Sequence, residues 1–292
     1  HGTVEKASDI PAFLQNIRRG RPTPDSIVHE VTERFEAIGG SPMMRITREQ
    51  AAALETRLGV VVRACARMWH PYPPEVIGAL KADGVETIVS VPLAPQSVHI
   101  YNTDVEKAAA EAELQVYSAA AWGLEPALIE AFADSIVEAH GRIAKPDDLA
   151  LVLSAHSLPM RVLAMGDPYE KDFRAMAEAI IAELDRRELP RKQTRIAFQS
   201  QGMGGGDWLG PDLETTFSEL REAGVDRLLM APVGFLTEHV ETAYDIDIEA
   251  KKLTEEMGFV QLERMEPMNT RERFIDALVA VTEPLLAQAA GH

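Results

Sequence analysis

Two segments of the sequence combine residue types that can exchange protons or bind metal ions. The first is SAHSLP, residues 154–159, in which His156 follows a short apolar run. A neutral imidazole is both a common metal ligand and a proton acceptor near pH 7. A histidine that only makes a hydrogen bond in a loop fits this spacing equally well. The spacing alone therefore leaves both interpretations of His156 open.

The second segment is PVGFLTEHVETAYDIDIE, residues 232–249, which reads as the end of a strand followed by a helix. At about 3.6 residues per turn, Glu241, Asp245 and Glu249 would share one helix face. A line of carboxylates that begins beside a strand end can lead hard cations inward or carry protons away. A solvated acidic face is the alternative, and the spacing alone favours it on so acidic a chain.

Two further segments carry candidate binding residues. Arg18, Arg19 and Arg21 lie close together, and guanidinium groups pair with carboxylates and phosphates. The alternative is that these arginines only offset the partial negative charge at the C-terminus of a helix. The glycine-rich run at residues 202–206 lacks the Lys-Ser/Thr of a phosphate-binding loop, so we expect a flexible loop before Trp208.

Short apolar runs alternate with helical patterns in the stretches around these candidates. The runs have few polar interruptions, as is typical of strands buried on both faces of a parallel sheet. They lie at residues 60–68, 87–95, 150–159, 195–200, 227–235 and 258–265, and helical patterns lie at 74–83, 104–112, 125–141, 172–188 and 213–223. The alternation predicts an α/β fold, in which ligands bind beyond the carboxyl ends of the strands.

The charged stretch at residues 145–148 lies midway along the chain and contains no apolar residue. It predicts two α/β halves, residues 1–144 and residues 145–292, with His156 and Glu241 in the second. A half with this pattern should begin on a strand, and His1-Gly2-Thr3 resembles the turn after one. We therefore expect an apolar strand directly before His1.

Composition excludes several classes of protein. The 292 residues carry a net charge of −17, which argues against nucleic-acid binding. No run approaches the roughly 20 apolar residues of a membrane helix. The single cysteine, Cys65, excludes a disulfide framework within the chain and a cysteine-rich zinc or iron–sulfur site. A cytoplasmic protein is the expectation.

Six motifs taken together resemble the ferrochelatase family, both in their order and in their separation. They are IRRGR (17–21), EAIGGSP (36–42), SAHSLP (154–159), GDPY (166–169), QS…WLGPD (199–212) and the long segment at 232–249. The resemblance covers nearly the whole chain and is closest to the coproporphyrin-type members. It implies two Rossmann-like halves, each with a parallel sheet flanked by helices, and a porphyrin cleft between them.

The resemblance also implies roles for individual residues. His156 and Glu241 would be catalytic and lie on the metal-insertion face, and Asp245 and Glu249 would extend this metal-binding line. Residues that match substrate-binding positions are Arg18, Arg19, Ser41, Tyr101 and Trp208. His1 stands where coproporphyrin-type members have tyrosine; it would ligate iron from the far side, or it is a tag residue.

The implied reaction is insertion of Fe²⁺ into a porphyrin, with release of two protons. Coproporphyrin III is the expected substrate, and protoporphyrin IX is the alternative. A cobalt or nickel chelatase and a non-catalytic porphyrin or haem carrier on the same fold also stay open. We expect no organic cofactor and no iron–sulfur cluster, a monomer, and porphyrin and Fe²⁺ as the molecules that it binds. His156 is either the base or a metal ligand.

Overall fold

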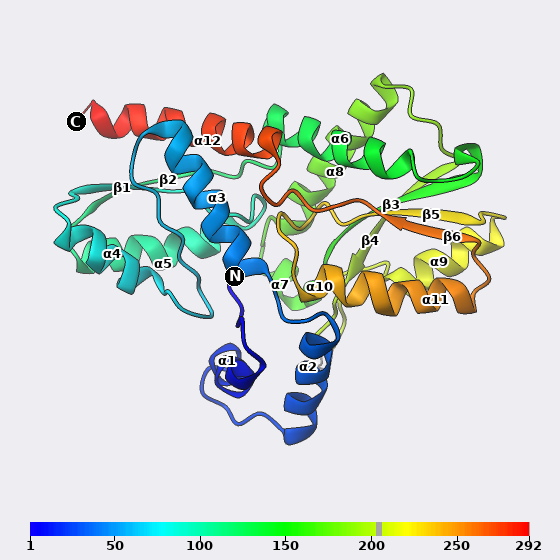
Figure 1. Ribbon diagram of the computed structural model, residues 1–292, viewed down its shortest axis with the longest axis horizontal. Helices are drawn as coiled ribbons and strands as arrows, with labels where there is room; N and C mark the ends of the chain where they lie inside the picture. The colour runs from blue at the N-terminus through cyan, green and yellow to red at the C-terminus, as the bar shows by residue number, and fades with distance from the viewer. Residues whose placement is uncertain (203–205, 292) are drawn as a thin grey trace. The chain divides into compact units, whose positions relative to one another are not determined.

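The computed structural model describes residues 1–202 and 206–291, and its chain forms two compact units (Figure 1). Unit 1 comprises His1–Glu125, Thr237–Val240 and Asn269–His292, and unit 2 comprises Pro126–Leu236 and Glu241–Met268. This division differs from the expected boundary after residue 144. Helix α6 (Pro126–His140) contacts the strands of unit 2, and the C-terminal helix α12 (Glu272–Ala290) contacts the strands of unit 1. Packing, rather than the charged stretch at 145–148, therefore sets the division.

Unit 2 is built on a parallel sheet with the strand order β4-β3-β5-β6. Its strands are β3 (Leu149–His156), β4 (Gln193–Gln199), β5 (Arg227–Ala231) and β6 (Gln261–Arg264). Strand β3 has a neighbour on each side and is buried along its first seven residues. This central strand is an apolar run because both of its faces are covered.

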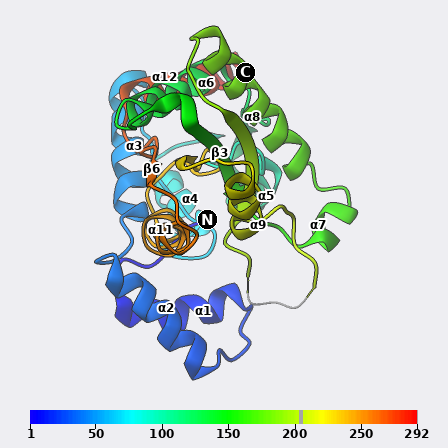
Figure 2. The same cartoon turned by 90° about the vertical axis from the view of Figure 1, so that its right-hand side faces the viewer.

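Helices cover both faces of the unit 2 sheet (Figures 1 and 2). Helices α6 and α8 (Tyr169–Arg186) lie on one face, and α9 (Leu213–Glu222) and α11 (Lys251–Glu256) lie on the other. Phe217 and Leu220 of α9 pack against Val152 of β3 and Met230 of β5 in one buried cluster. Side chains alternate across a strand, so residues next to these in sequence face α6 and α8.

Unit 1 holds a smaller parallel sheet of β1 (Thr87–Ser90) and β2 (Gln115–Ser118). Helix α4 (Pro73–Ala82) packs on α5 (Val98–Glu111), and α12 contacts α3 (Met43–Leu58) and both strands. A separate apolar cluster joins α1 (Ile10–Ile17) to α2 (Asp25–Ala37) through Phe13 and Phe35. The remaining short elements are η1 (Ala7–Asp9), η2 (Pro146–Asp148), α7 (Met160–Ala164), α10 (Val240–Ala243) and η3 (Asp245–Ala250).

The predicted α/β class with parallel sheets is confirmed, and five of the six apolar runs contain a strand. The prediction of a strand at residues 60–68 is wrong, because this segment forms no ladder with any described strand. Strand β2 went unrecognised, since three of its four residues are Gln, Tyr and Ser. The predicted glycine-rich loop falls partly on residues 203–205, which lie outside the described residues. No described helix is long and apolar enough to cross a membrane.

Candidate active site

His156 is the last residue of β3, where the buried strand reaches the carboxyl end of the unit 2 sheet. It lies opposite Gln199, the last residue of β4, in the parallel ladder. The hydroxyl of Tyr169 donates to the backbone oxygen of His156 at 2.8 Å. The backbone on which this histidine stands is therefore held both by the sheet and by α8.

The side chain of His156 contacts the side chain of Glu241, with 3.0 Å between Nδ1 and Oε2. Both side chains are about one-third exposed, at 36% and 32%. Burial lowers the pKa of His156, but the charge and hydrogen bond of Glu241 and the charge of Asp245 outweigh it. The pKa of His156 therefore lies above its ordinary value of 6.5. The structure thus brings together the two residues that were expected to be catalytic.

The turn after β5, which precedes Glu241 in the sequence, lies very close to the end of β3. The amide of Gly234 donates to the backbone oxygen of Ser154 at 3.0 Å. A Cβ at Gly234 would lie 2.5 Å from the Cβ of Ala155, far inside van der Waals contact. Only glycine lets the turn after β5 lie against the end of β3.

The side chain of Gln199 links Glu241 to the sheet. Its Nε2 donates to the backbone oxygen of Glu241 at 2.8 Å, and its Oε1 accepts from the hydroxyl of Ser154 at 2.7 Å. Gln199 and Ser154 are both buried. This amide fixes the backbone of Glu241 relative to β3, the strand that carries His156. Spacing gave no sign of this role, although Gln199 lies near the end of an apolar run.

Asp245 is buried, and it accepts a hydrogen bond of 2.5 Å from the hydroxyl of Ser200. Ser200 directly follows β4 and has a left-handed backbone, with φ of 59°. Few residues other than glycine adopt this conformation, and it is enriched at functional sites. Ser200 is thus a second positioning residue that the motif spacing did not reveal.

The carboxylate line does not lie on a regular α-helix as expected. Helix α10 ends at Ala243, and Asp245–Ala250 form the π-helix η3. The amide of Glu249 donates to the oxygen of Tyr244, five residues earlier, at 3.0 Å. Such a turn is wider than an α-helical one, so the spacing argument no longer places the three carboxylates in one row. Asp245 is buried beside the His156 pair, whereas Glu249 is exposed.

The residues that the structure describes contain no group of three or more His, Cys, Asp or Glu side chains poised to hold a metal ion. The His156–Glu241 pair supplies one nitrogen and one carboxylate. Nδ1 of His156 faces Glu241, which leaves Nε2 for a second partner. This arrangement suits proton transfer and brief handling of a metal ion better than its permanent storage.

Trp208 lies in the segment that follows the glycine-rich run, and it forms an isolated antiparallel bridge with Pro159. The next residue, Leu209, accepts a hydrogen bond of 2.7 Å from the hydroxyl of Ser157. The segment that carries Trp208 is thereby attached to the loop that leaves His156.

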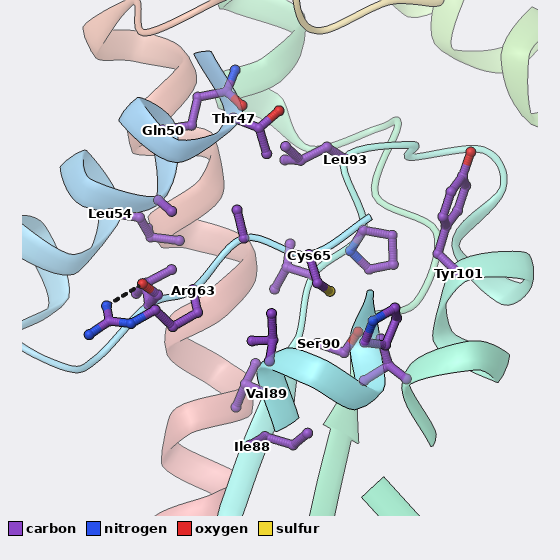
Figure 3. Close-up of a pocket in the computed structure, with 18 of the residues that line it drawn as sticks. Thr47, Gln50, Leu54, Arg63, Cys65, Ile88, Val89, Ser90, Leu93 and Tyr101 are labelled. Carbon is purple, nitrogen blue, oxygen red and sulfur yellow. Dashed lines mark hydrogen bonds between the residues drawn. The ribbon is translucent and has the colours of Figure 1, made fainter. Parts of the chain in front are cut away.

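The other expected substrate residues lie in unit 1. Arg18 and Arg19 are exposed at the C-terminal end of α1, and Nε of Arg18 donates to the oxygen of Pro22. Ser41 is buried, and its hydroxyl has no hydrogen-bond partner among the described residues. His1 and Tyr101 both line one cavity (Figure 3), and neither arginine is among its lining residues.

Comparison with known proteins gives a consistent result. The family model described as Ferrochelatase matches residues 1–285. The chain belongs to the ferrochelatase family. It is an enzyme that inserts iron into a porphyrin in haem biosynthesis, as the motif resemblance predicted.

Relatives within the ferrochelatase family match along almost their whole length. A ferrochelatase of Acidobacterium capsulatum is 32% identical, over 97% of this chain and 91% of the relative. A coproporphyrin III ferrochelatase of Anoxybacillus flavithermus is 35% identical, over 96% and 92%. The solved structure of SirB from Bacillus subtilis with Fe³⁺ has a TM-score of 0.57 at 15% identity, covering 85% of this chain and 92% of that one. That last likeness supports the fold alone.

Proposed function

We propose that this ferrochelatase inserts Fe²⁺ into coproporphyrin III and uses the His156–Glu241 pair at the carboxyl end of β3. The 3.0 Å contact between Nδ1 and Oε2 is the observation that carries the proposal. Relatives named coproporphyrin III ferrochelatase, 32–35% identical, support the choice of porphyrin.

Each inserted Fe²⁺ displaces two protons from the pyrrole nitrogens. When Nδ1–H of His156 donates to the Glu241 carboxylate, the lone pair of Nε2 is available to a pyrrole N–H. The carboxylate then stabilises the imidazolium that forms, and this agrees with the raised pKa of His156. We therefore assign His156 the role of base. Bending of the porphyrin by remote binding energy would expose the pyrrole proton.

We assign the remaining carboxylates an electrostatic role. Asp245 is buried near His156 and raises its pKa, so the same charge would draw Fe²⁺ towards the pair. Glu249 is exposed one π-helical turn further on and would extend this field. Loss of Asp245 should therefore weaken metal capture more than proton transfer.

Coproporphyrin III carries four propionates, which this acidic protein has to hold with local cations. Arg18 and Arg19 are exposed and suit bidentate pairing with carboxylates. Each charge-assisted bond would contribute about 1.5–3 kcal/mol if desolvated and much less if exposed. His1, Ser41, Tyr101 and Trp208 stay proposed contacts of the porphyrin. The proposal includes no organic cofactor or iron–sulfur cluster, a monomeric enzyme and a cytoplasmic location.

The test is anaerobic metallation followed by absorption spectroscopy, with Fe²⁺ and either coproporphyrin III or protoporphyrin IX. We expect a higher kcat/KM for coproporphyrin III. His156→Ala should abolish metallation while porphyrin binding persists. His29→Ala is a matched control, because His29 also pairs with a glutamate, Glu33, but on an exposed helix face. Turnover of His156→Ala near the wild-type rate would overturn the site.

Arg18→Ala tests the choice of porphyrin. Its preference for coproporphyrin III should shrink, whereas the exposed Arg45→Ala should keep the wild-type preference. A wild type that metallates only protoporphyrin IX would overturn the proposed substrate and leave the His156 assignment intact.

A further inference from the structure

The π-helix η3 is attached to both outer strands of the unit 2 sheet. On one side, Asp245 accepts the hydrogen bond from Ser200, which directly follows β4. On the other side, Asp247 forms an ion pair with Arg264, the last residue of β6. Strands β4 and β6 are the first and the last in the described strand order of this sheet. The two contacts therefore hold η3 across the carboxyl end of the sheet.

The carboxylates of Asp245 and Asp247 lie on different sides of η3, since residues two apart on a helix do not face each other. Ile246, which lies between them, belongs to the buried cluster on the α9 face of the sheet. The apolar contact of Ile246 and the polar contacts on either side of it therefore fix the rotation of η3 about its own axis.

The ion pair between Arg264 and Asp247 has the geometry of a firm anchor. Nε of Arg264 donates to Oδ1 of Asp247, and Nη2 donates to Oδ2, both at 2.7 Å. Such a bidentate contact fixes orientation as well as distance. The side chain of Arg264 is only 15% exposed, so water screens this pair less than a surface pair. The backbone oxygen of Arg264 in turn accepts from Arg142 at 3.0 Å, which holds the end of β6 in place.

The backbone hydrogen bonds of η3 lie between two helical registers. The oxygen of Tyr244 accepts from the amide of Ile248, four residues later, at 3.1 Å and from that of Glu249, five residues later, at 3.0 Å. The amide of Lys251 donates to the oxygen of Ile246, again five residues earlier. Bonds across five residues are rare in proteins, where the α-helical spacing of four dominates. Contacts from outside the helix therefore have to select the wider register.

The register of η3 decides where the Asp245 carboxylate lies. Gln199 fixes the backbone of Glu241 before η3 begins, so a change of register leaves Glu241 in place. A change to the α-helical register would turn the residues after α10 by roughly the 100° that one residue spans. Asp245 would then no longer lie buried beside His156 and Glu241.

We propose that the Arg264–Asp247 ion pair selects the π register of η3, and that Arg264 is thereby a positioning residue for the capture of Fe²⁺ by Asp245. Arg264 needs no contact with the porphyrin or the metal ion for this role. The inference rests on the electrostatic role proposed for Asp245 above. Loss of the ion pair should therefore raise KM for Fe²⁺ and leave the proton transfer assigned to His156 largely intact.

The experiment measures initial rates of metallation against Fe²⁺ concentration, together with amide hydrogen exchange. Arg264→Gln, Asp247→Asn and the double variant remove one or both sides of the ion pair. Arg264→Lys keeps the charge but loses the bidentate geometry. Arg186→Gln is the matched control, because Arg186 makes a bidentate contact of the same kind with Glu183, entirely within α8.

We expect Arg264→Gln and Asp247→Asn each to raise KM for Fe²⁺ about tenfold, equivalent to about 1.4 kcal/mol, with little change in kcat. Arg264→Lys should recover part of this loss. The double variant should be no worse than either single variant, because all three remove the same interaction. The amides of Glu249 and Lys251 should exchange faster, whereas those of β3 should stay protected. Arg186→Gln should match the wild type in both kinetic constants.

A wild-type KM for Fe²⁺ in Arg264→Gln would overturn the proposal, and so would a double variant in which the two single losses multiply. Asp245→Asn separates this failure from that of the proposed function. If Asp245→Asn raises KM and Arg264→Gln does not, only the role of Arg264 is wrong. If neither raises KM, the role of Asp245 is wrong, and that of Arg264 with it. Should a circular-dichroism melt show that Arg264→Gln does not fold, Asp247→Asn decides the matter, since Asp247 is 44% exposed.

Discussion

Replacing Gln199 with leucine should separate the positioning of Glu241 from its chemistry. The change removes the 2.8 Å bond to the backbone of Glu241 and the 2.7 Å bond from Ser154. A buried polar group left without a partner costs about 1–3 kcal/mol, and the Ser154 hydroxyl is fully buried whereas the Glu241 carbonyl is only part-buried. We therefore expect the free energy of unfolding to fall by about 2–4 kcal/mol.

The effect on catalysis should exceed the effect on folding. Loss of the amide frees the backbone of Glu241 to move relative to His156, and a displacement near 1 Å can cost about a hundredfold in rate. Since Glu241 raises the pKa of His156, that pKa should fall towards its ordinary value.

Urea unfolding, initial rates of metallation and an NMR titration of His156 test this prediction. Gln201→Leu is the matched control, because Gln201 is exposed two residues further on. If Gln199→Leu loses stability while its rate and the titration of His156 match the wild type, Gln199 only supports the sheet. The reasoning that links it to Glu241 would then be refuted.

Three further predictions concern the same site. The rate of metallation should fall as the pH drops through the pKa of His156, which lies above 6.5, because the imidazolium cannot accept a proton. Glu241→Gln should lower the overall rate and move this acid limb of the pH–rate profile to lower pH. A limb that does not move would contradict the pairing of Glu241 with His156. Asp245→Asn should raise KM for Fe²⁺ more than it lowers kcat, measured as initial rate against Fe²⁺ concentration; equal small effects would indicate a merely solvated carboxylate. Gly234→Ala should cost about 1–3 kcal/mol in urea unfolding, because its Cβ would overlap Ala155, and full wild-type stability would contradict the close approach of this turn to β3.

Features that depend on local pattern were predictable from the sequence. The apolar run before His156 is long and bounded, and it forms the central strand β3. The helical patterns at 125–141 and 213–223 correspond to α6 and α9 within two residues at each end. The proximity of His156 and Glu241 followed from the motif resemblance, since 85 residues separate them and no spacing rule connects them.

Features that depend on partners were not predictable in this way. Residues 60–68 have the composition of a strand, but strand pairing requires a neighbouring backbone that composition does not reveal. The π-helix at Asp245–Ala250 inserts a wider turn into a sequence with an α-helical spacing of carboxylates. Gln199 acts through a backbone oxygen 42 residues away, and a side chain that binds backbone leaves no pattern in the partner's residue types.

The outer edge of β1, which pairs with no described strand, also bears on how the protein behaves in concentrated solution. An unpaired strand edge can pair with a strand of another molecule, which is the first step of edge-to-edge aggregation. The net charge of −17 keeps the molecules apart at neutral pH, and near the sequence pI of about 4.9 this repulsion vanishes. Mild acid or high salt should therefore promote precipitation, and light scattering as a function of pH would follow it.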